Sequence, residues 1–275
     1  MRIVVALLAA LPLLAGASPA TSPSPVLEPA SPWRVQYNAD YCSLSRDFGR
    51  GDQAVVMQFK RESGPDQYEI AVAGSAVPTL SAPLNIRLRL VGQNLEHRLS
   101  GFSMLIPMRS EGIARADEND ASFLDAITEE QQLELRLGTR HPMILHLTGA
   151  RAALAAFDKC YDTLLASWGV DRAEIKKAKV PPKPTGNPAH WATTEDYPAE
   201  ALRQRKFGPV EFMLMTDALG MPKFCKVIRG SETTSLNEKT CFLMMKRARF
   251  KPARDDKGNA VSGYFISRVN WIIPS

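Results

Sequence analysis

The sequence lacks the patterns that mark most catalytic and nucleotide-binding proteins. It contains no glycine-rich phosphate-binding loop, no C-x-x-C pair, no zinc-type spacing of Cys and His, and no internal repeat. No apolar run after residue 20 is long enough to cross a membrane. These absences argue against phosphate-loop nucleotide binding, redox catalysis, a zinc-dependent fold and a solenoid.

Three fragments resemble catalytic or metal-binding motifs, but each departs from its pattern. Gly101-Phe-Ser103 is not followed by the glycine of a nucleophile elbow. Asp117-Glu-Asn-Asp120 begins like a calcium loop, but the sixth position should be glycine and is Ser122. His141 and His146 lie five apart around an expected strand, which directs them to opposite faces. The sequence therefore predicts no catalytic residue, no metal ligand and no cofactor, and a protein that is not an enzyme.

The first 20 residues have the pattern of an export signal. Arg2 supplies the positive start, residues 3–17 are almost entirely aliphatic, and Ala15-Gly-Ala17 offers a cleavage site. The apolar run is about 15 residues long, shorter than the roughly 20 that a membrane helix needs. We expect residues 1–20 to be a cleaved signal peptide and the mature protein to be periplasmic. If the N-terminus is not cleaved, the protein is anchored in the inner membrane and faces the periplasm.

The composition is that of a folded protein, with 45% hydrophobic and 23% charged residues, and a length of 275 residues favours two domains. Residues 21–32 are rich in Pro, Ser and Ala and predict a disordered tether. Residues 170–190 contain four prolines and several lysines and predict an extended linker. The two domains are therefore expected at 33–169 and 191–275.

The four cysteines are expected to form two disulfides, because an even number of cysteines in an exported chain favours oxidation. Of the three pairings, we choose Cys42 with Cys160 and Cys225 with Cys241, because each bond then stays within one expected domain. Four buried free thiols are the alternative.

The net charge of +5 comes partly from two basic clusters. One lies in the linker (Lys176, Lys177, Lys179, Lys183) and the other follows a predicted helix (Lys246, Arg247, Arg249, Lys251, Arg254). In the periplasm such charge could attract an anionic glycolipid, a cell-wall polymer or an acidic protein segment. A solvated helix face and a solubilising linker are the favoured explanation of this charge. Export argues against nucleic acid as a partner.

The N-terminal domain is expected to be mostly antiparallel β with one closing helix. Short runs of strand composition occur at 54–60, 68–73, 85–90, 97–107, 132–137 and 143–147. Residues 150–168 have an apolar stripe at helical spacing, and Cys160 lies beside it. The strand series and the segment from Thr148 into the helix resemble the invasion-associated locus B type of secreted β domain. We take no function from that resemblance.

The C-terminal domain is expected to contain helix, β-hairpin, helix and strand. Tyr197-Pro198 opens a helix, Pro209–Thr216 and Lys223–Arg229 form a hairpin around Asp217-Ala-Leu-Gly220, and Tyr264–Ile272 is the last strand. Between hairpin and last strand, Cys241, Met244, Met245 and Ala248 fall on one helical stripe. The whole chain is therefore predicted to be α+β.

This order of motifs resembles the C-terminal domain of the TonB family, over about residues 191–275. The resemblance implies a three-stranded antiparallel sheet that binds a peptide of a protein partner, such as an outer-membrane receptor, by strand addition. Carried onto this sequence, the edge is the last strand, and the segment before Tyr197 is a second contact. The partner-binding residues it implies are Tyr197, Pro198, Tyr264, Ile266, Arg268 and Asn270.

The sequence also departs from that family. Thr193-Thr-Glu-Asp196 replaces the glutamine-bearing approach to Tyr-Pro, and the chain lacks an obvious membrane helix and a long Pro-rich rod. Three functions therefore stay open: a periplasmic binding protein, a membrane-tethered energy transducer, and an enzyme seated in the N-terminal domain. The sequence does not determine the oligomeric state.

Overall fold

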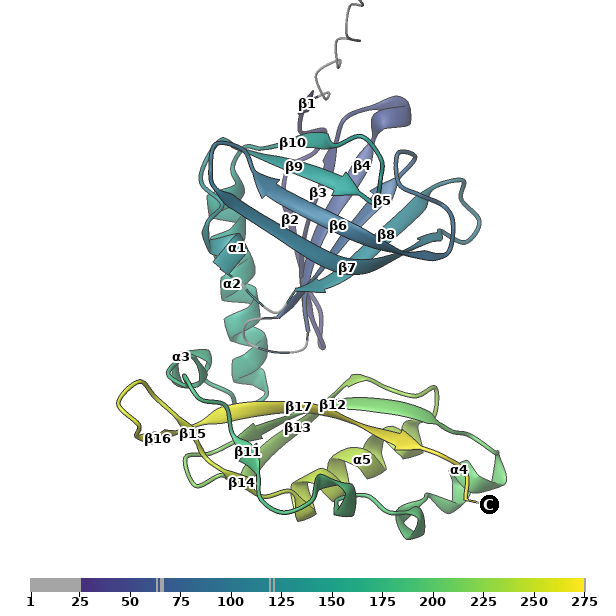
Figure 1. The fold of residues 1–275 in the computed structure, drawn as a ribbon, viewed down its shortest axis with the longest axis vertical. Coiled ribbons are helices and arrows are strands. Elements are labelled where there is room, and N and C mark those ends of the chain that lie inside the picture. The colour runs from purple at the N-terminus through teal and green to yellow at the C-terminus, as the bar shows by residue number, and fades with distance from the viewer. Residues whose placement is uncertain (1–25, 63, 65–66, 119, 121, 275) are drawn as a thin grey trace, which may run out of the picture.

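The structure is a computed structural model that describes residues 26–274 except 63, 65, 66, 119 and 121. The predicted signal peptide and residues 21–25 of the predicted tether lie outside the described residues. The fold is α+β, with a large curled sheet above and a small three-stranded sheet below (Figure 1). None of the helices in the described part of the chain has the length and hydrophobicity that a membrane crossing requires.

The large sheet has ten strands in the order β1-β10-β9-β6-β7-β8-β5-β4-β3-β2. All neighbours are antiparallel except β1 and β10. The strands are β1 (Val26–Leu27), β2 (Arg34–Tyr37), β3 (Cys42–Phe48), β4 (Val55–Arg61), β5 (Tyr68–Gly74), β6 (Ala82–Leu90), β7 (Leu95–Leu105), β8 (Gly112–Glu118), β9 (Gln131–Leu137) and β10 (Met143–Leu147). We call this part, with its helices α1 (Ser122–Asp125) and α2 (Ala150–Ser167), the barrel domain.

Strand formation follows the alternation of apolar and polar residues. In β9, Leu133, Leu135 and Leu137 are buried and alternate with Glu134 and Arg136 on the outer face. The strand β8 has no counterpart among the predicted runs. Its inward positions include Ala114, Ala116 and Glu118. Because these side chains are small or charged, the strand does not show the alternation of apolar and polar residues that marks the other strands.

Residues 26–32, predicted as part of a disordered tether, are instead ordered. Leu27 of β1 pairs with β10 and is 5% exposed, while Pro29 bridges to Phe48 at the end of β3. The Ala30 N–H donates to the Asp47 carbonyl at 2.8 Å, and the Gly49 N–H donates to the Glu28 carbonyl at 2.9 Å. This segment thus joins the two ends of the curled sheet. The prediction of disorder was wrong here because composition does not show that the sheet offers unpaired backbone groups to this segment.

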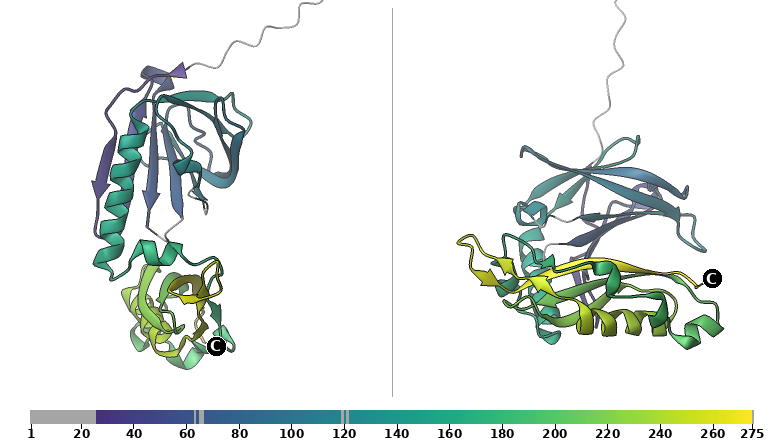
Figure 2. Two further views of the ribbon diagram at one scale, coloured as in Figure 1. Left: turned by 90° about the vertical axis from the view of Figure 1, so that its left-hand side faces the viewer. Right: turned by 60° about the horizontal axis from the view of Figure 1, so that its bottom comes forward.

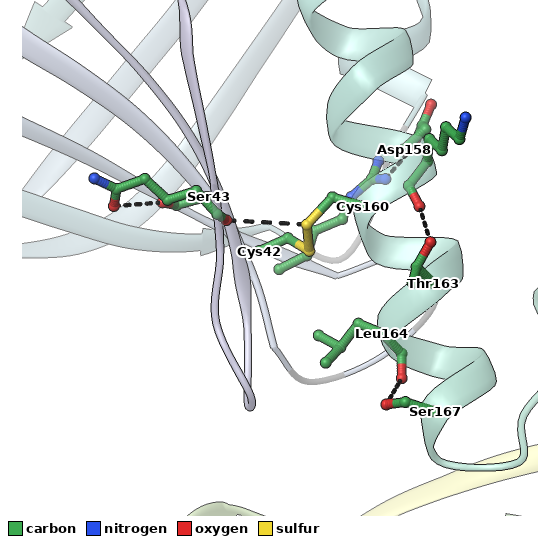
Figure 3. Close-up of a disulfide and its surroundings, with 10 residues drawn as sticks. Cys42, Ser43, Asp158, Cys160, Thr163, Leu164 and Ser167 are labelled. Carbon is green, nitrogen blue, oxygen red and sulfur yellow. Dashed lines mark hydrogen bonds and ion pairs between the residues drawn. A yellow bond between two sulfur atoms is a disulfide. The ribbon is translucent and has the colours of Figure 1, made fainter.

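Helix α2 packs along β2 and β3 and closes the barrel domain (Figure 2). Phe157, Tyr161 and Leu165 on its inner stripe are fully buried. The predicted disulfide between Cys42 of β3 and Cys160 of α2 is confirmed, with Cα atoms 6.1 Å apart (Figure 3).

An ion network lies along the middle of α2. Arg61, which is 1% exposed, pairs with Asp158, and Arg172 of α3 (Arg172–Lys176) lies 3.1 Å from both Asp158 and Asp162. Burial alone would raise the pKa of Asp158, but the two guanidinium groups outweigh it and hold that pKa below its ordinary value. The network therefore attaches α3 to the barrel domain.

The small sheet has the order β13-β12-β17 and is antiparallel throughout, as predicted. Its strands are β12 (Gly208–Thr216), β13 (Pro222–Arg229) and β17 (Gly263–Trp271), and its helices are α4 (Ala199–Arg203) and α5 (Thr234–Arg247). Gly220 in the β12–β13 turn has φ +78°, and a Cβ there would lie 2.0 Å from the Phe250 carbonyl oxygen. Only glycine fits this turn.

The two faces of the small sheet pack against different cores. On β12, Val210, Phe212 and Leu214 face α5, as the alternation predicts, whereas Met213 and Met215 are buried against the barrel domain. The predicted disulfide Cys225–Cys241 is confirmed and joins β13 to α5, with Cα atoms 5.5 Å apart. The buried stripe of α5 runs through Leu236, Thr240, Leu243 and Met244, so Cys241 lies at its margin.

The linker is folded onto the C-terminal domain rather than extended freely. Besides α3, it contains β11 (Lys183–Pro184), which pairs with β14 (Phe250–Lys251), and Val180 exchanges backbone hydrogen bonds with Arg254. The remaining short strands are β15 (Ala253–Arg254) and β16 (Ala260–Val261), which pair with each other. Proline content predicts stiffness, but it does not show that the intervening N–H groups find carbonyl partners.

Candidate functional site

The last strand, β17, forms one edge of the small sheet. It pairs with β12 over nine consecutive residues without a register shift, from Gly263 with Thr216 to Trp271 with Gly208. No strand in the described part of the chain pairs with its other side. The opposite edge, β13, is less regular, because its pairing with β12 has two register shifts. Irregular edges are poor templates for a further strand, so β17 is the better one.

The predicted contact residues on β17 divide into two pairs. Tyr264 and Ile266 are half-buried and pack against the barrel domain. Arg268 and Asn270, further along the same face, are exposed. The structure thus brings all four to one face of the edge strand, but only Arg268 and Asn270 lie beyond the cover of the barrel domain.

Tyr197 and Pro198 do not lie among the exposed residues of this edge. Tyr197 is 8% exposed, its ring lies 5.3 Å from that of Trp271, and its hydroxyl donates to the Lys206 carbonyl at 2.6 Å. Pro198 is the residue before α4. The motif therefore holds the end of β17 against the core, and Tyr197 is not exposed on this edge. Its role as a direct partner contact stays a prediction.

The segment before Tyr197 does lie beside β17, as the resemblance implied. Trp191 packs against Phe265 with ring centroids 6.0 Å apart. Its carbonyl accepts a hydrogen bond from Arg247 of α5 at 3.1 Å, and the 3₁₀ turn Thr194–Asp196 that follows has a capping box formed by Thr193 and Asp196. Asp196 also accepts two hydrogen bonds from Arg247 of α5. Arg247 is the main cause that lowers the pKa of Asp196 to about 2.

Among the cavities that β17 lines, two lie one at each half of the strand. We call the first, of about 540 Å³, the composite pocket; it is lined by Gln67, Ile175, Ala178, Lys179, residues 181–184 and residues 264–266. We call the second, of about 310 Å³, the Trp191 hollow; it is lined by residues 188, 189, 191 and 192, by Phe212 and Met244, and by residues 267–270. The edge strand therefore has a hollow beside each of its halves.

One comparison with known proteins decides the type of this domain. Residues 193–273 match the family model described as Gram-negative bacterial TonB protein C-terminal. Residues 193–273 form a TonB C-terminal domain. No curated protein and no solved structure matches the chain. The match does not reach the barrel domain, so the resemblance of that domain to the locus B type stays a prediction.

Sequence reasoning missed four residues beside the edge strand of the TonB C-terminal domain. They are Gln67 of the barrel domain, Ile175 and Pro182 of the linker, and Trp191 of the segment before Tyr197. Trp191 carried a usable signal, since a tryptophan that follows a Pro-rich segment needs a core to pack in. Gln67 and Ile175 carried none, because only the packing of one domain on the other brings them to β17.

The structure also brings the two basic clusters together beside the TonB C-terminal domain. Lys183 is opposite Lys251 in the β11–β14 pair, and Val180, next to Lys179, pairs with Arg254. Lys179, Lys183 and Lys251 form no ion pair with an acidic residue in the described part of the chain. One end of the edge strand is therefore positively charged.

Proposed function

We propose that this is an exported periplasmic protein whose TonB C-terminal domain binds an extended segment of a protein partner by strand addition to β17. The observation that carries the proposal is the outer edge of β17. Within the part of the chain that the structure describes, no strand pairs with this edge. A regular edge with unpaired backbone groups is the template that strand addition requires.

Two further features support β17 as the binding edge. The strand is fixed at its end by Tyr197 and Trp271, so little ordering would be needed on binding. The flanking cavities provide room for side chains of an added strand, because alternate side chains of a strand point to opposite faces.

The partner class follows from the family. TonB C-terminal domains interact with proteins such as outer-membrane receptors, and we propose a protein of that class as partner. We propose no catalytic role for either domain. The support for that proposal is that the sequence contains no recognisable catalytic set.

A second candidate function is that of a membrane-tethered energy transducer, and the match to a TonB protein domain favours it. The two candidates differ in the fate of residues 1–20. N-terminal sequencing of the mature protein is expected to start near Ser18 or Thr21. An intact Met1 in the inner-membrane fraction would instead overturn the exported soluble protein and favour the tethered transducer.

The strand-addition proposal is tested by peptide selection and cross-linking. The mature chain with both disulfides is panned against a displayed library of random ten-residue peptides, and the selected peptides are synthesised. A photo-reactive residue replaces the exposed Arg268 on β17 and, as the matched control, the exposed Lys223 on β13. Cross-linking at position 268 alone is expected. Cross-linking only at position 223, or no selected peptide at all, would refute binding at β17.

A further inference from the structure

The composite pocket is built from three parts of the chain that are distant in sequence. The barrel domain provides Gln67 and the adjoining α3 provides Ile175, the linker provides Pro182, and β17 provides Tyr264 and Ile266. Its volume of about 540 Å³ lies within the range of about 300–1,000 Å³ that is usual for small-ligand sites. Part of the proposed peptide site therefore belongs to the barrel domain and to the linker.

The walls of the pocket are held in place by hydrogen bonds outside it. The Lys179 N–H donates to the Arg254 carbonyl at 2.7 Å, and the Thr185 N–H donates to the Arg249 carbonyl at 2.8 Å. Helix α3 is capped by Asp171, whose side chain accepts from the Ala173 N–H at 2.8 Å, and it is attached to α2 through Arg172. A pocket with fixed walls binds a side chain without first having to order itself.

The chemistry of the walls differs from that of the rim. Ile175 is 4% exposed and Pro182 is buried, so the floor next to Tyr264 and Ile266 is largely apolar. Lys179 and Lys183 are exposed at the rim, and neither has an acidic partner among the residues that the structure describes. An apolar floor under a positive rim complements a large apolar side chain that has a carboxylate close by in sequence.

We propose that the composite pocket is a side-chain subsite of the peptide edge, and that it selects partner segments with a large aliphatic or aromatic residue next to Asp or Glu. This inference rests on the proposed strand addition at β17. A strand rises about 3.3 Å per residue, so residues 264–266 face about three residues of the added segment. The apolar side chain enters the pocket and the adjacent carboxylate contacts Lys179 or Lys183.

The test compares selected peptides on the wild-type chain and on three variants. Ala178→Trp fills the composite pocket from its lining, and Ala189→Trp fills the Trp191 hollow as the matched control. The double variant Lys179→Glu with Lys183→Glu reverses the charge of the rim at two exposed positions. Binding is measured by fluorescence anisotropy with each selected peptide and with versions in which the apolar residue is Ala or the acid is Lys.

On the wild type, replacement of the apolar residue by Ala is expected to weaken binding about tenfold. Ala178→Trp should reduce that preference to less than about twofold, whereas Ala189→Trp should retain it. The charge-reversed double variant should prefer the Lys peptide to the acidic one. Peptides that cross-link to β17 but show no apolar or acidic preference would overturn the subsite alone. A lack of any binding at β17 would overturn both the subsite and strand addition.

Discussion

Trp168, the residue after α2, stacks on Phe224 of β13, with ring centroids 5.9 Å apart and planes inclined by 15°. The ammonium group of Lys226 lies 5.1 Å from the centroid of the Trp168 ring and also pairs with Asp40. Arg229 lies 2.6 Å from Asp117 of β8. The barrel domain and the TonB C-terminal domain are thus joined by an aromatic stack with ion pairs around it.

The stack predicts the effect of Phe224→Ala. Because Phe224 is half-buried, its truncation should lower the free energy of unfolding by about 2 kcal/mol. It should also loosen the contact between the domains, which small-angle X-ray scattering would detect as a larger maximum dimension. Phe242→Ala, at a side chain that is 58% exposed on α5, is the control and should change stability by less than about 0.5 kcal/mol. Equal losses in both variants, with an unchanged scattering profile, would contradict the role of the stack.

The ion pair between Asp196 and Arg247 predicts a specific pH dependence. The pKa of Asp196 is lowered from 3.8 to about 2, chiefly by hydrogen bonds from Arg247. A lowered pKa in the folded state stabilises the protein above about pH 4, and this contribution is lost as the pH falls toward 2. Asp196→Asn should therefore cost about 1 kcal/mol at pH 6, after allowance for solvent screening, and almost nothing at pH 2.

The measurement for Asp196 is urea denaturation of wild type and variant at pH 6, 4, 3 and 2. Glu238→Gln, at an exposed position of α5 with no ion pair in the described part of the chain, serves as control. Its effect should be below about 0.5 kcal/mol at every pH. If the difference in unfolding free energy between Asp196→Asn and wild type stays constant from pH 6 to pH 2, the predicted role of the ion pair is wrong.

The two disulfides predict losses of different size. The Cys225–Cys241 bond joins residues that are 16 apart in sequence. Its removal by a double alanine substitution should lower the free energy of unfolding by about 3 kcal/mol. Removal of Cys42–Cys160, which spans 118 residues, should cost about 4 to 5 kcal/mol. Denaturation under non-reducing conditions measures both losses, and mass mapping of non-reduced peptides checks the pairing. A peptide that joins Cys42 to Cys225 would contradict the structure.

The closure of the curled sheet predicts a sharp limit to N-terminal truncation. A chain that starts at Val26 keeps every described contact of β1 and serves as the reference. A chain that starts at Ser31 loses the buried Leu27 side chain and the hydrogen bonds of residues 28 and 30, and should be about 3 kcal/mol less stable. Thermal unfolding compares the two chains. Equal stability would show that residues 26–30 contribute nothing to closure.

Much of the local structure could be predicted from the sequence, since it depends on patterns within a few residues. The alternation in β9 and β10, the apolar stripe of α2 and the order of motifs from Tyr197 to Trp271 predicted their elements closely. The strand β8 was missed because alanines fill its inward positions, and a small side chain carries too little hydrophobicity to show a period.

The candidate site could be predicted only in part. Arg268 and Asn270 of the edge strand lie exposed, as the resemblance implied, and Trp191 joins them from the segment before Tyr197. Tyr264 and Ile266 lie on the predicted face of the strand, but that face packs against the barrel domain at these positions. Tyr197 is a core residue. A strand pattern shows which residues share a face, but it does not show what will cover that face.

By itself the sequence determined the α+β class, the pairing of the cysteines by domain and the TonB type of the last 80 or so residues. The class and the TonB type rest on periodicity and turn chemistry, which are local along the chain, and the pairing rests on the Pro-rich segment that separates the two expected domains. Only the tertiary structure decided that residues 26–30 close the barrel domain, that the linker is folded, and that Ile175 lies beside β17. Such contacts join residues that are far apart in sequence, and their partners are determined by how the two domains pack.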